Sequence, residues 1–288
     1  MTGFELVKVA LDALYAEALQ TYGPNTDATI AARIQYLSTS YSGLNNPKRP
    51  PVNYQDPATR FAYVFKYVAS HSDYIVQVME AWRSHVGGQI MAGADTMRIT
   101  CVGGGPGSDL IGFLRYLDEN KNEPIKKATA YLLDREQAWA DTWTELDDSL
   151  KSGLVLHANF QPLDVTNPAS WMYQKKFLQA DLFTMSYFVS EVKSLDSTGI
   201  VSTFWTALFQ QAKSGARFLY VDNGHDSFNQ YFDALWQAAG LHLVLGETNE
   251  WKWPRGNEQK SELGGYLTKF GQSPKLKTML TYRVLAKP

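Results

Sequence analysis

The sequence contains almost no cysteine, little net charge and no long apolar run. Its 288 residues include a single cysteine, Cys101, so no internal disulfide can form and a reducing compartment is compatible with the composition. The formal net charge of −2 gives no overall positive field for non-specific binding to a phosphate backbone. No stretch approaches the ~20 apolar residues of a membrane-spanning helix, and Glu5 and Lys8 interrupt the first apolar run, unlike in a secretory signal. We therefore expect an intracellular protein, cytoplasmic or nuclear, with no membrane partner.

Length and composition predict one large α/β domain with a smaller accessory region. Hydrophobic residues make up 44% and charged residues 19% of the chain, which is typical of globular proteins.

In the first third of the chain, apolar residues recur at three- and four-residue intervals, the pattern of amphipathic helices. Helices are expected over residues 4–20, 27–38, 56–70 and 72–86, with an irregular connection at 39–58. This pattern predicts an all-helical region over residues 1–95.

From Met97 onward, short β-rich runs alternate with helical ones. The β-rich runs cover residues 98–102, 128–133, 155–160, 177–183, 217–221, 241–246 and 276–285. Such alternation is typical of a parallel sheet with helices on both faces. We therefore expect a second, α/β domain over residues 96–288.

A glycine cluster follows the first of these runs and leads directly into a helix. Gly103, Gly104, Gly105 and Gly107 let the backbone approach a ligand closely, and the helix start offers unpaired N–H groups. The spacing lacks the last glycine of the dinucleotide pattern, where Ser108 stands, and it lacks the Gly-Lys-Ser/Thr ending of a P-loop. It resembles the G-x-G-x-G loop of class I S-adenosylmethionine (SAM) dependent methyltransferases, a resemblance that covers residues 97–288. The resemblance implies a Rossmann-like, seven-stranded, mostly parallel sheet, SAM as cofactor, and cofactor contacts from these glycines.

Two acidic residues follow the next two predicted strands. The resemblance implies that Asp134, followed by Arg135, accepts hydrogen bonds from the ribose hydroxyls of the cofactor. It implies likewise that Asp164 meets the adenine amino group while the backbone N–H of Val165 addresses the ring. Each aspartate taken alone could instead cap a helix or form a turn. The correct order of all three elements favours the cofactor site.

The edge of the fourth strand and one departure from the family pattern complete the predicted cofactor site. In the family, the fourth strand edge flanks the methyl group, which makes Ser186 a cofactor contact and Tyr187 a catalytic candidate; a buried tyrosine could equally be part of the core. The family commonly has an acid two residues before the first loop glycine, where this chain has Cys101. Asp109, at the start of the following helix, is a substitute for that acid.

His225 follows the fifth predicted strand, at the sheet edge where α/β proteins bind ligands. Its intrinsic pKa lies near neutrality, so it could remove a proton from an acceptor hydroxyl or amine, or be a solvated loop histidine. No Cys/His cluster has metal-ligand spacing, so no metal is expected. Methyl transfer can depend mainly on positioning, so catalytic groups need not be conspicuous.

The acceptor and the oligomeric state stay open at this level. The fourth strand lacks the Asn/Asp-Pro-Pro-Tyr/Phe signature of methyltransferases that act on planar amide or base nitrogens. The helical region 1–95, where Tyr63 and Tyr67 share a helix face, resembles the substrate-covering caps of small-molecule methyltransferases, which implies a cap on the substrate side. We therefore expect transfer to a nitrogen or oxygen of a small molecule or protein. RNA is an alternative, with Lys48 and Arg49 as contacts, and so is a non-catalytic binding module that retains the fold. A nicotinamide-dependent dehydrogenase is disfavoured by the glycine spacing.

Overall fold

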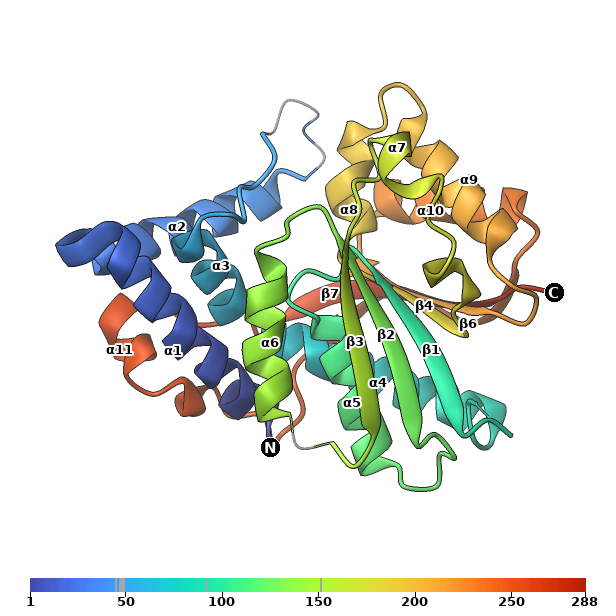
Figure 1. The fold of residues 1–288 in the computed structure, drawn as a ribbon, viewed down its shortest axis with the longest axis horizontal. Coiled ribbons are helices and arrows are strands. Elements are labelled where there is room, and N and C mark those ends of the chain that lie inside the picture. Colours follow the sequence, from blue (N-terminus) through green and yellow to red (C-terminus); the bar gives the residue numbers. More distant parts are fainter. Residues whose placement is uncertain (45, 47–49, 92, 151) are drawn as a thin grey trace.

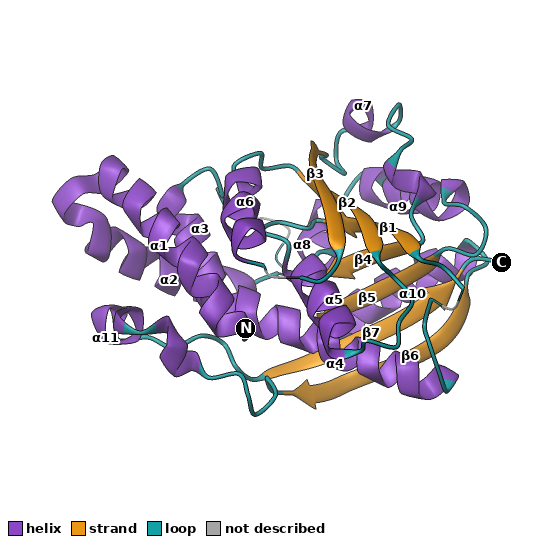
Figure 2. Ribbon diagram, turned by 60° about the horizontal axis from the view of Figure 1, so that its bottom comes forward, coloured by secondary structure: helices purple, strands orange, loops and turns teal. Residues whose placement is uncertain are grey.

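A seven-stranded sheet forms the centre of the molecule (Figures 1 and 2). The computed structural model describes residues 1–44, 46, 50–91, 93–150 and 152–288. The strand order is β3-β2-β1-β4-β5-β7-β6, with β7 antiparallel to its neighbours β5 and β6 and the other pairs parallel. The strands are β1 (Thr96–Val102), β2 (Lys127–Asp134), β3 (Val155–Pro162), β4 (Leu182–Ser186), β5 (Arg217–Asn223), β6 (His242–Lys252) and β7 (Thr278–Ala286). The predicted Rossmann-like α/β fold is confirmed.

Helices cover both faces of the sheet, as the connections between parallel strands require. Successive β5 residues point to opposite faces: Leu219 and Val221 belong to one hydrophobic core, and Phe218 and Tyr220 to the other. The first core holds α4, α5 and α6, and the second holds α9 and α10. The helices that follow the strands are α5 (Ser108–Glu119), α6 (Trp139–Ser149), α7 (Pro168–Trp171), α8 (Val189–Val192), α9 (Ile200–Gln211) and α10 (Asp226–Ala238), with 3-10 turns η3 (Phe177–Gln179) and η4 (Lys193–Leu195).

The region before β1 is helical, as predicted. Its elements are α1 (Gly3–Tyr22), the 3-10 turn η1 (Gly23–Asn25), α2 (Thr26–Ser42), α3 (Pro57–Tyr63), the π-helical segment η2 (Val64–Val68) and α4 (Ala69–Val86). The predicted break between residues 70 and 72 is wrong, because the chain runs on through α3, η2 and α4 in helical conformation. The Ser72 hydroxyl donates to the carbonyl of Ala69 at 2.8 Å within this run and caps nothing. The irregularity lies earlier, in η2, where cavity-lining side chains are found.

The fourth strand starts later than its apolar sequence predicts. Residues 177–179 form the turn η3, whose first carbonyl, that of Phe177, accepts a hydrogen bond from Thr100 Oγ1 at 2.9 Å. The strand β4 begins only at Leu182. A short apolar run fits a buried turn as well as a buried strand, which explains the error. β4 is therefore a short strand, and it ends at Ser186, at the edge of the site.

The connection between β6 and β7 returns to the N-terminal helices. It contains the 3-10 turn η5 (Lys260–Leu263) and α11 (Gly265–Phe270), which lie beside α1 in Figure 1. Tyr266 donates from its hydroxyl to Asp12 Oδ1 at 2.7 Å, and its ring meets Phe61 with centroids 5.1 Å apart. The two ends of the chain thus share one apolar cluster. Within the described residues, no helix is both long and apolar enough to cross a membrane.

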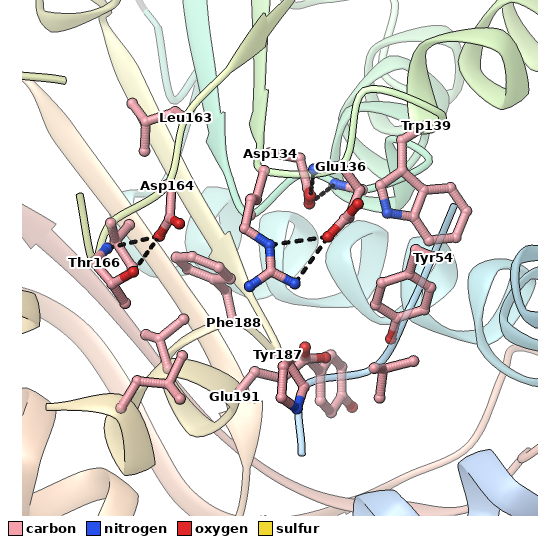
Figure 3. Close-up of a pocket in the computed structure, with 18 of the residues that line it drawn as sticks. Tyr54, Asp134, Glu136, Trp139, Leu163, Asp164, Thr166, Tyr187, Phe188 and Glu191 are labelled. Atoms are coloured by element: carbon pink, nitrogen blue, oxygen red, sulfur yellow. Dashed lines mark hydrogen bonds and ion pairs between the residues drawn. The ribbon is translucent and has the colours of Figure 1, made fainter. Parts of the chain in front are cut away.

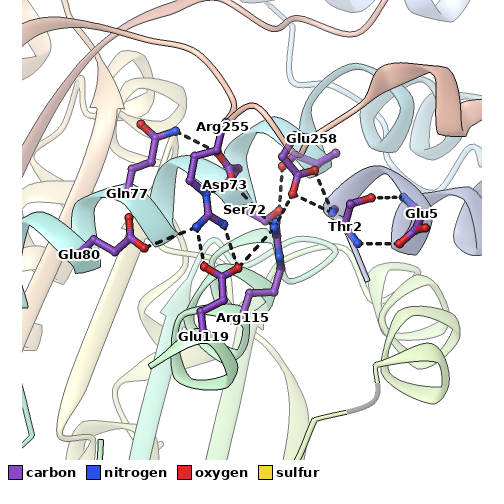
Figure 4. A network of polar contacts seen from close by, with 12 residues as sticks. Thr2, Glu5, Ser72, Asp73, Gln77, Glu80, Arg115, Glu119, Arg255 and Glu258 are labelled. Carbon is purple, nitrogen blue, oxygen red and sulfur yellow. Dashed lines mark hydrogen bonds and ion pairs between the residues drawn. The ribbon is translucent and has the colours of Figure 1, made fainter. Parts of the chain in front are cut away.

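A buried ionic network fixes this C-terminal connection to three helices (Figure 4). Asp73 of α4 is fully buried and accepts from Arg255 Nε at 2.8 Å and from the Arg255 backbone N–H at 2.8 Å. The Arg255 guanidinium also binds the Glu119 carboxylate of α5. Arg115 pairs with Glu258, whose carboxylate accepts from the backbone N–H of Gly3 at 2.9 Å. The network therefore joins α1, α4, α5 and the β6–β7 connection.

We expect Asp73→Ala to destabilise the fold by about 3 kcal/mol, because the variant removes the fully buried carboxylate of the network and leaves Arg255 with only partly exposed acidic partners. Glu80→Ala is the matched control: it lies on the same helix and meets the same Arg255 at 3.5 Å, but its side chain is 39% exposed. Its cost should stay below about 1 kcal/mol. Urea unfolding monitored by far-UV circular dichroism measures both values, and equal losses in the two variants would contradict the assignment of the network as a core element.

Candidate functional site

The main cavity opens at the carboxyl ends of β1, β2, β3 and β4 (Figure 3). It encloses about 890 Å³ of space free of atoms, open solvent included. Ligands of open α/β sheets bind at this edge, where the strand order reverses. Eight of the predicted site residues line it: Gly103, Gly105, Asp134, Arg135, Asp164, Val165, Ser186 and Tyr187.

The glycine loop turns at the floor of the cavity. Gly103, Gly105 and Gly107 all have positive φ, at 67°, 47° and 87°, where a side chain is strained. A Cβ at Gly103 would lie 2.0 Å from the ring of Phe188, and a Cβ at Gly107 would lie 2.4 Å from Trp143. Glycine is therefore required here by two close approaches as well as by backbone conformation.

Asp134 stands at the end of β2 and faces the loop. Its Oδ2 accepts from the backbone N–H of Gly105 at 3.0 Å, and its Oδ1 accepts from that of Glu136 at 2.9 Å. Burial raises the pKa of this carboxyl to about 6, against the lowering effect of these two hydrogen bonds. Neighbouring Arg135 is exposed at the cavity rim and forms an ion pair with Glu136 at 2.8 Å. The carboxylate is thus oriented by backbone contacts, and each of its two oxygens keeps a further lone pair that can accept a hydrogen bond from a ligand.

Asp164 occupies the next position along the same edge, after β3. Its Oδ1 accepts from the backbone N–H of Thr166 at 2.8 Å and from its hydroxyl at 2.6 Å, an arrangement typical of an Asx turn. Val165 and Leu163 add buried apolar surface to the same wall. Asp134 and Asp164 therefore line a single cavity with a flat apolar patch beside the second acid, which suits a nucleoside.

The residues after β4 form the opposite wall. The Oγ of Ser186 is buried and has no hydrogen-bond partner among the described residues. Tyr187 adopts a positive φ of 55°, unusual for a residue with a side chain, and its backbone N–H donates to the carbonyl of Val221 at 2.7 Å. Asp222, buried near the end of β5, accepts from the backbone N–H of Ser190 at 2.8 Å and so holds the start of α8. Non-glycine residues in this conformation cluster at functional sites.

Four predicted site residues do not line the cavity. Gly104 donates its backbone N–H to the carbonyl of Leu133 at 3.0 Å, and Gly107 packs under Trp143. Asp109 is buried behind the loop, where its Oδ2 accepts from the hydroxyl of Thr184 at 2.5 Å. Gly104 and Gly107 thus shape the loop without facing the cavity, and Asp109 supports it from behind.

His225 is not brought to the site. It is exposed at the start of α10, where its Nδ1 lies 3.2 Å from the backbone N of Ser227 and 3.1 Å from its hydroxyl oxygen. The structure therefore gives the predicted catalytic role of His225 no support, because the ring caps a helix away from the cavity. Lys48 and Arg49, predicted as RNA contacts, lie outside the described residues.

Several cavity residues were not singled out as site residues in the sequence. Trp139 of α6 packs its indole against Tyr54 and Tyr63 of the cap, with centroids 4.9 and 5.5 Å apart. Glu191 of α8 accepts from the hydroxyl of Tyr41 at 2.7 Å. The cap therefore meets the sheet through aromatic side chains directly above the cavity. Arg60 takes no part, because its guanidinium pairs with Glu17 and with the carbonyls of residues 54 and 55.

A second cavity adjoins the first under the cap. Residues of both regions line it: Ser38, Tyr41, Ser42, Tyr63, Lys66, Tyr67, His71, Tyr187, Glu191, Asn223 and Lys275. Tyr63, Tyr187 and Glu191 line both cavities. The rings of His71 and Tyr187 stack with centroids 3.8 Å apart and planes 11° apart. Burial, helped by the charge of Lys275, holds the pKa of His71 well below its usual value, so this ring is neutral near pH 7.

The chain matches one known family and the fold of many solved structures. The family, described as "Putative SAM-dependent methyltransferase", matches residues 54–223, more than half of the chain. No curated protein matches the sequence.

Among solved structures, the fold is similar to that of the N-methyltransferase NodS from Bradyrhizobium japonicum WM9, which was solved with S-adenosylhomocysteine (SAH). The two chains are 8% identical over 86% of this chain and 98% of that one, with a TM-score of 0.43. The fold is also similar to that of an O-methyltransferase family protein from Burkholderia thailandensis, with 13% identity over 93% and 74% of the two chains and a TM-score of 0.48.

The buried carboxyl of Asp109 predicts a pH dependence of stability. Burial raises its pKa from 3.8 to about 6 in the folded state. Between these values the folded protein binds more protons than the unfolded chain, so this group makes the fold less stable as pH rises from 4 to 6. We expect Asp109→Asn to stabilise the fold relative to the native chain at pH 7, by at most about 3 kcal/mol, and by much less at pH 4.

Urea unfolding at a series of pH values measures this difference. Glu145→Gln, in which an exposed carboxyl on α6 is replaced, is the control, and its effect should not change across the same pH range. A difference between native chain and Asp109→Asn that is independent of pH would show that Asp109 does not titrate in this window.

Proposed function

Because the chain belongs to a family of SAM-dependent methyltransferases, we propose that it transfers the methyl group of SAM to a nitrogen or oxygen of a small-molecule or protein acceptor held in the second cavity. The chain is an enzyme of this class, with SAM as its cofactor. One observation carries the proposal about the acceptor: Tyr63, Tyr187 and Glu191 line both cavities, so the two binding spaces meet at a single place.

Residues of the first cavity fit a bound nucleoside with an amino-acid extension. We assign the ribose to Asp134 and the adenine to Asp164 and Val165, since both acids are oriented by backbone N–H groups. The turn at Gly103 and Gly105 leaves room for the rest of the cofactor. The unpartnered Ser186 Oγ would gain a hydrogen-bond partner there, which removes the cost of burying it alone. Arg135 and Glu136 close the rim beside the ribose.

SAM, when bound, supplies an electrophilic methyl group on a positively charged sulfonium. The protein contributes a negative potential at the junction of the cavities through Glu191, whose charge raises the pKa of the nearby Tyr67 hydroxyl in addition to the effect of burial. A carboxylate at this position favours a positively charged ligand group. It can also accept a proton from an acceptor hydroxyl or amine.

Tyr187 acts in the proposal as the wall that aligns the acceptor. Its ring is fixed by stacking on His71, and its backbone is fixed by the hydrogen bond to Val221. Burial raises the pKa of its hydroxyl far above neutrality, so Tyr187 stays protonated and can donate a hydrogen bond but is not a base. Holding two reactants in contact distance can supply much of the rate enhancement of a transfer reaction. His225 has no part in this mechanism.

The assigned adenine site predicts a choice between adenosine and inosine. Asp164 accepts a hydrogen bond from the exocyclic amino group, which inosine lacks, so we expect adenosine to bind about tenfold more tightly than inosine. Asp164→Ala should lose this preference, whereas Asp134→Ala should weaken both nucleosides by similar factors and keep it. Calorimetric titration of both nucleosides with the native chain and the two variants provides six affinities, and an unchanged preference in Asp164→Ala would place the adenine elsewhere.

Methyl transfer itself is tested with SAM labelled in the methyl group. We expect label to reach small-molecule or protein fractions of a cell extract, and Asp134→Ala to lower the yield at least about tenfold at limiting SAM through weaker cofactor binding. His225→Ala serves as the matched control and should transfer label at the native rate. Transfer confined to the RNA fraction would overturn the proposed acceptor class and leave the methyltransferase activity intact.

A further inference from the structure

Two lysines that do not reach the cofactor cavity line the second cavity. Lys66 projects from the π-helical segment η2, and Lys275 lies in the chain leading into β7. The backbone N–H of Lys275 donates to the carbonyl of Lys66 at 2.9 Å, so the two segments are fastened together. Neither lysine lines the first cavity. Two positive charges are thus brought to one place by residues that are distant in sequence.

Within the part of the chain that the structure describes, neither lysine forms an ion pair with an acidic side chain. Among the described residues, no carboxylate lies within 4.0 Å of either ammonium group, and the only hydrogen bond of the Lys66 ammonium is to the carbonyl of Ser273, at 3.1 Å. Burial lowers the pKa of both amines, and the charge of Lys66 lowers that of Lys275 further, although Lys275 remains accessible to solvent. An anion bound between them would relieve this repulsion.

The walls between the lysines and the junction are aromatic. Tyr41, Tyr63 and Tyr67 come from the cap, while His71 and Tyr187 stack on each other. Ring centroids of Tyr67 and His71 are 5.4 Å apart, so these faces form a continuous surface. A flat ring packs against such faces with favourable quadrupole and dispersion contacts. Glu191, the carboxylate among the residues that line the second cavity, also lines the cofactor cavity, which the two lysines do not.

We propose that the acceptor is a planar aromatic compound with an anionic substituent, a carboxylate or a phosphate, bound by Lys66 and Lys275. Its ring lies among the cap tyrosines, and the end to be methylated points to Glu191 and Tyr187. This inference rests on the proposed function, because it assigns the acceptor to the second cavity. It names Lys66 and Lys275 as the residues that determine specificity.

The test uses four probes that share one ring: benzoate, phenyl phosphate, benzyl alcohol and benzylamine. Binding to the full chain is measured by ligand-observed NMR titration, with and without saturating SAH. We expect at least one of the two anions to bind about tenfold more tightly than benzyl alcohol, and benzylamine to bind least. Comparison of benzoate with phenyl phosphate distinguishes the two anionic groups, and inorganic phosphate alone should bind more weakly than phenyl phosphate.

Variants separate this site from general charge effects. Lys66→Met and Lys275→Met should each weaken binding of the preferred anion about threefold to tenfold and leave benzyl alcohol unchanged. The matched control, Lys277→Met, removes a lysine two residues away that lies over the Trp251 ring, and it should not alter any probe. SAH affinity should be the same in all variants, which also reports that they are folded.

Each outcome supports or overturns the inference. Equal or tighter binding of benzyl alcohol or benzylamine, no detectable binding of either anion at millimolar concentration, or an anion preference that survives in both lysine variants overturns it. If SAH binds normally but the anion preference is missing, only this inference fails. If the anion preference is present but SAH does not bind, the proposed function fails and the anion site stands.

Discussion

The ring of Phe188 and the backbone at Gly103 approach each other so closely that a single methyl group at position 103 would overlap the ring at 2.0 Å. This contact joins the ends of β1 and β4, two adjacent strands whose carboxyl ends border the cofactor cavity. With Phe188 held there, the chain must turn at Tyr187, and the turn takes the left-handed conformation with φ 55°. The side chain of Tyr187 then faces the cap, and α8 begins in the direction that carries Glu191 to the junction of the cavities. The geometry of both cavities thus depends on one place where two loops touch.

Buried carboxyl groups surround this contact and give the site its electrostatic character. Asp109, Asp134 and Asp222 come from three different elements, and burial raises the pKa of each to about 6. Each accepts hydrogen bonds from hydroxyl or backbone donors, which lowers the cost of burial without removing it. A protein accepts such a cost where the groups orient a loop or meet a ligand. Asp222 illustrates the first use, since it holds α8, and Asp134, which accepts from the backbone N–H of Gly105, would combine both in the proposed cofactor site.

Local sequence predicts those site residues that follow directly from strand order. Gly103, Asp134, Asp164 and Ser186 each end or follow a strand, and parallel strands bring their carboxyl ends to one edge, so their meeting in one cavity could be anticipated. Here the family resemblance and the strand pattern led to the same residues. The Rossmann-like fold was predictable for the same reason, although the start of β4 was not.

Residues contributed by distant segments could not be predicted in this way. Lys66 and Lys275 meet because the β6–β7 connection returns to the cap, and this return depends on the buried pairing of Asp73 with Arg255. Nothing in the pattern around either lysine indicates the other. His225 shows the opposite error: it follows β5 at the correct edge, but its ring turns back to cap α10. The position of a residue after a strand determines at which edge of the sheet it lies, but it does not determine where its side chain points.

The aromatic cap suits a reaction that needs exclusion of water more than it needs acid and base groups. Burial holds the pKa of the Tyr41, Tyr54 and Tyr63 hydroxyls well above the usual value, and the charge of Glu191 adds to this effect, so all three stay neutral near pH 7. Neutral hydroxyls can orient a ligand without adding negative charge that would compete with Glu191 for a sulfonium. Aromatic walls lower the local dielectric constant and so strengthen the interaction of Glu191 with a positive group. The cap tyrosines therefore enhance the effect of a single carboxylate, which explains how this site can act without a conspicuous catalytic base.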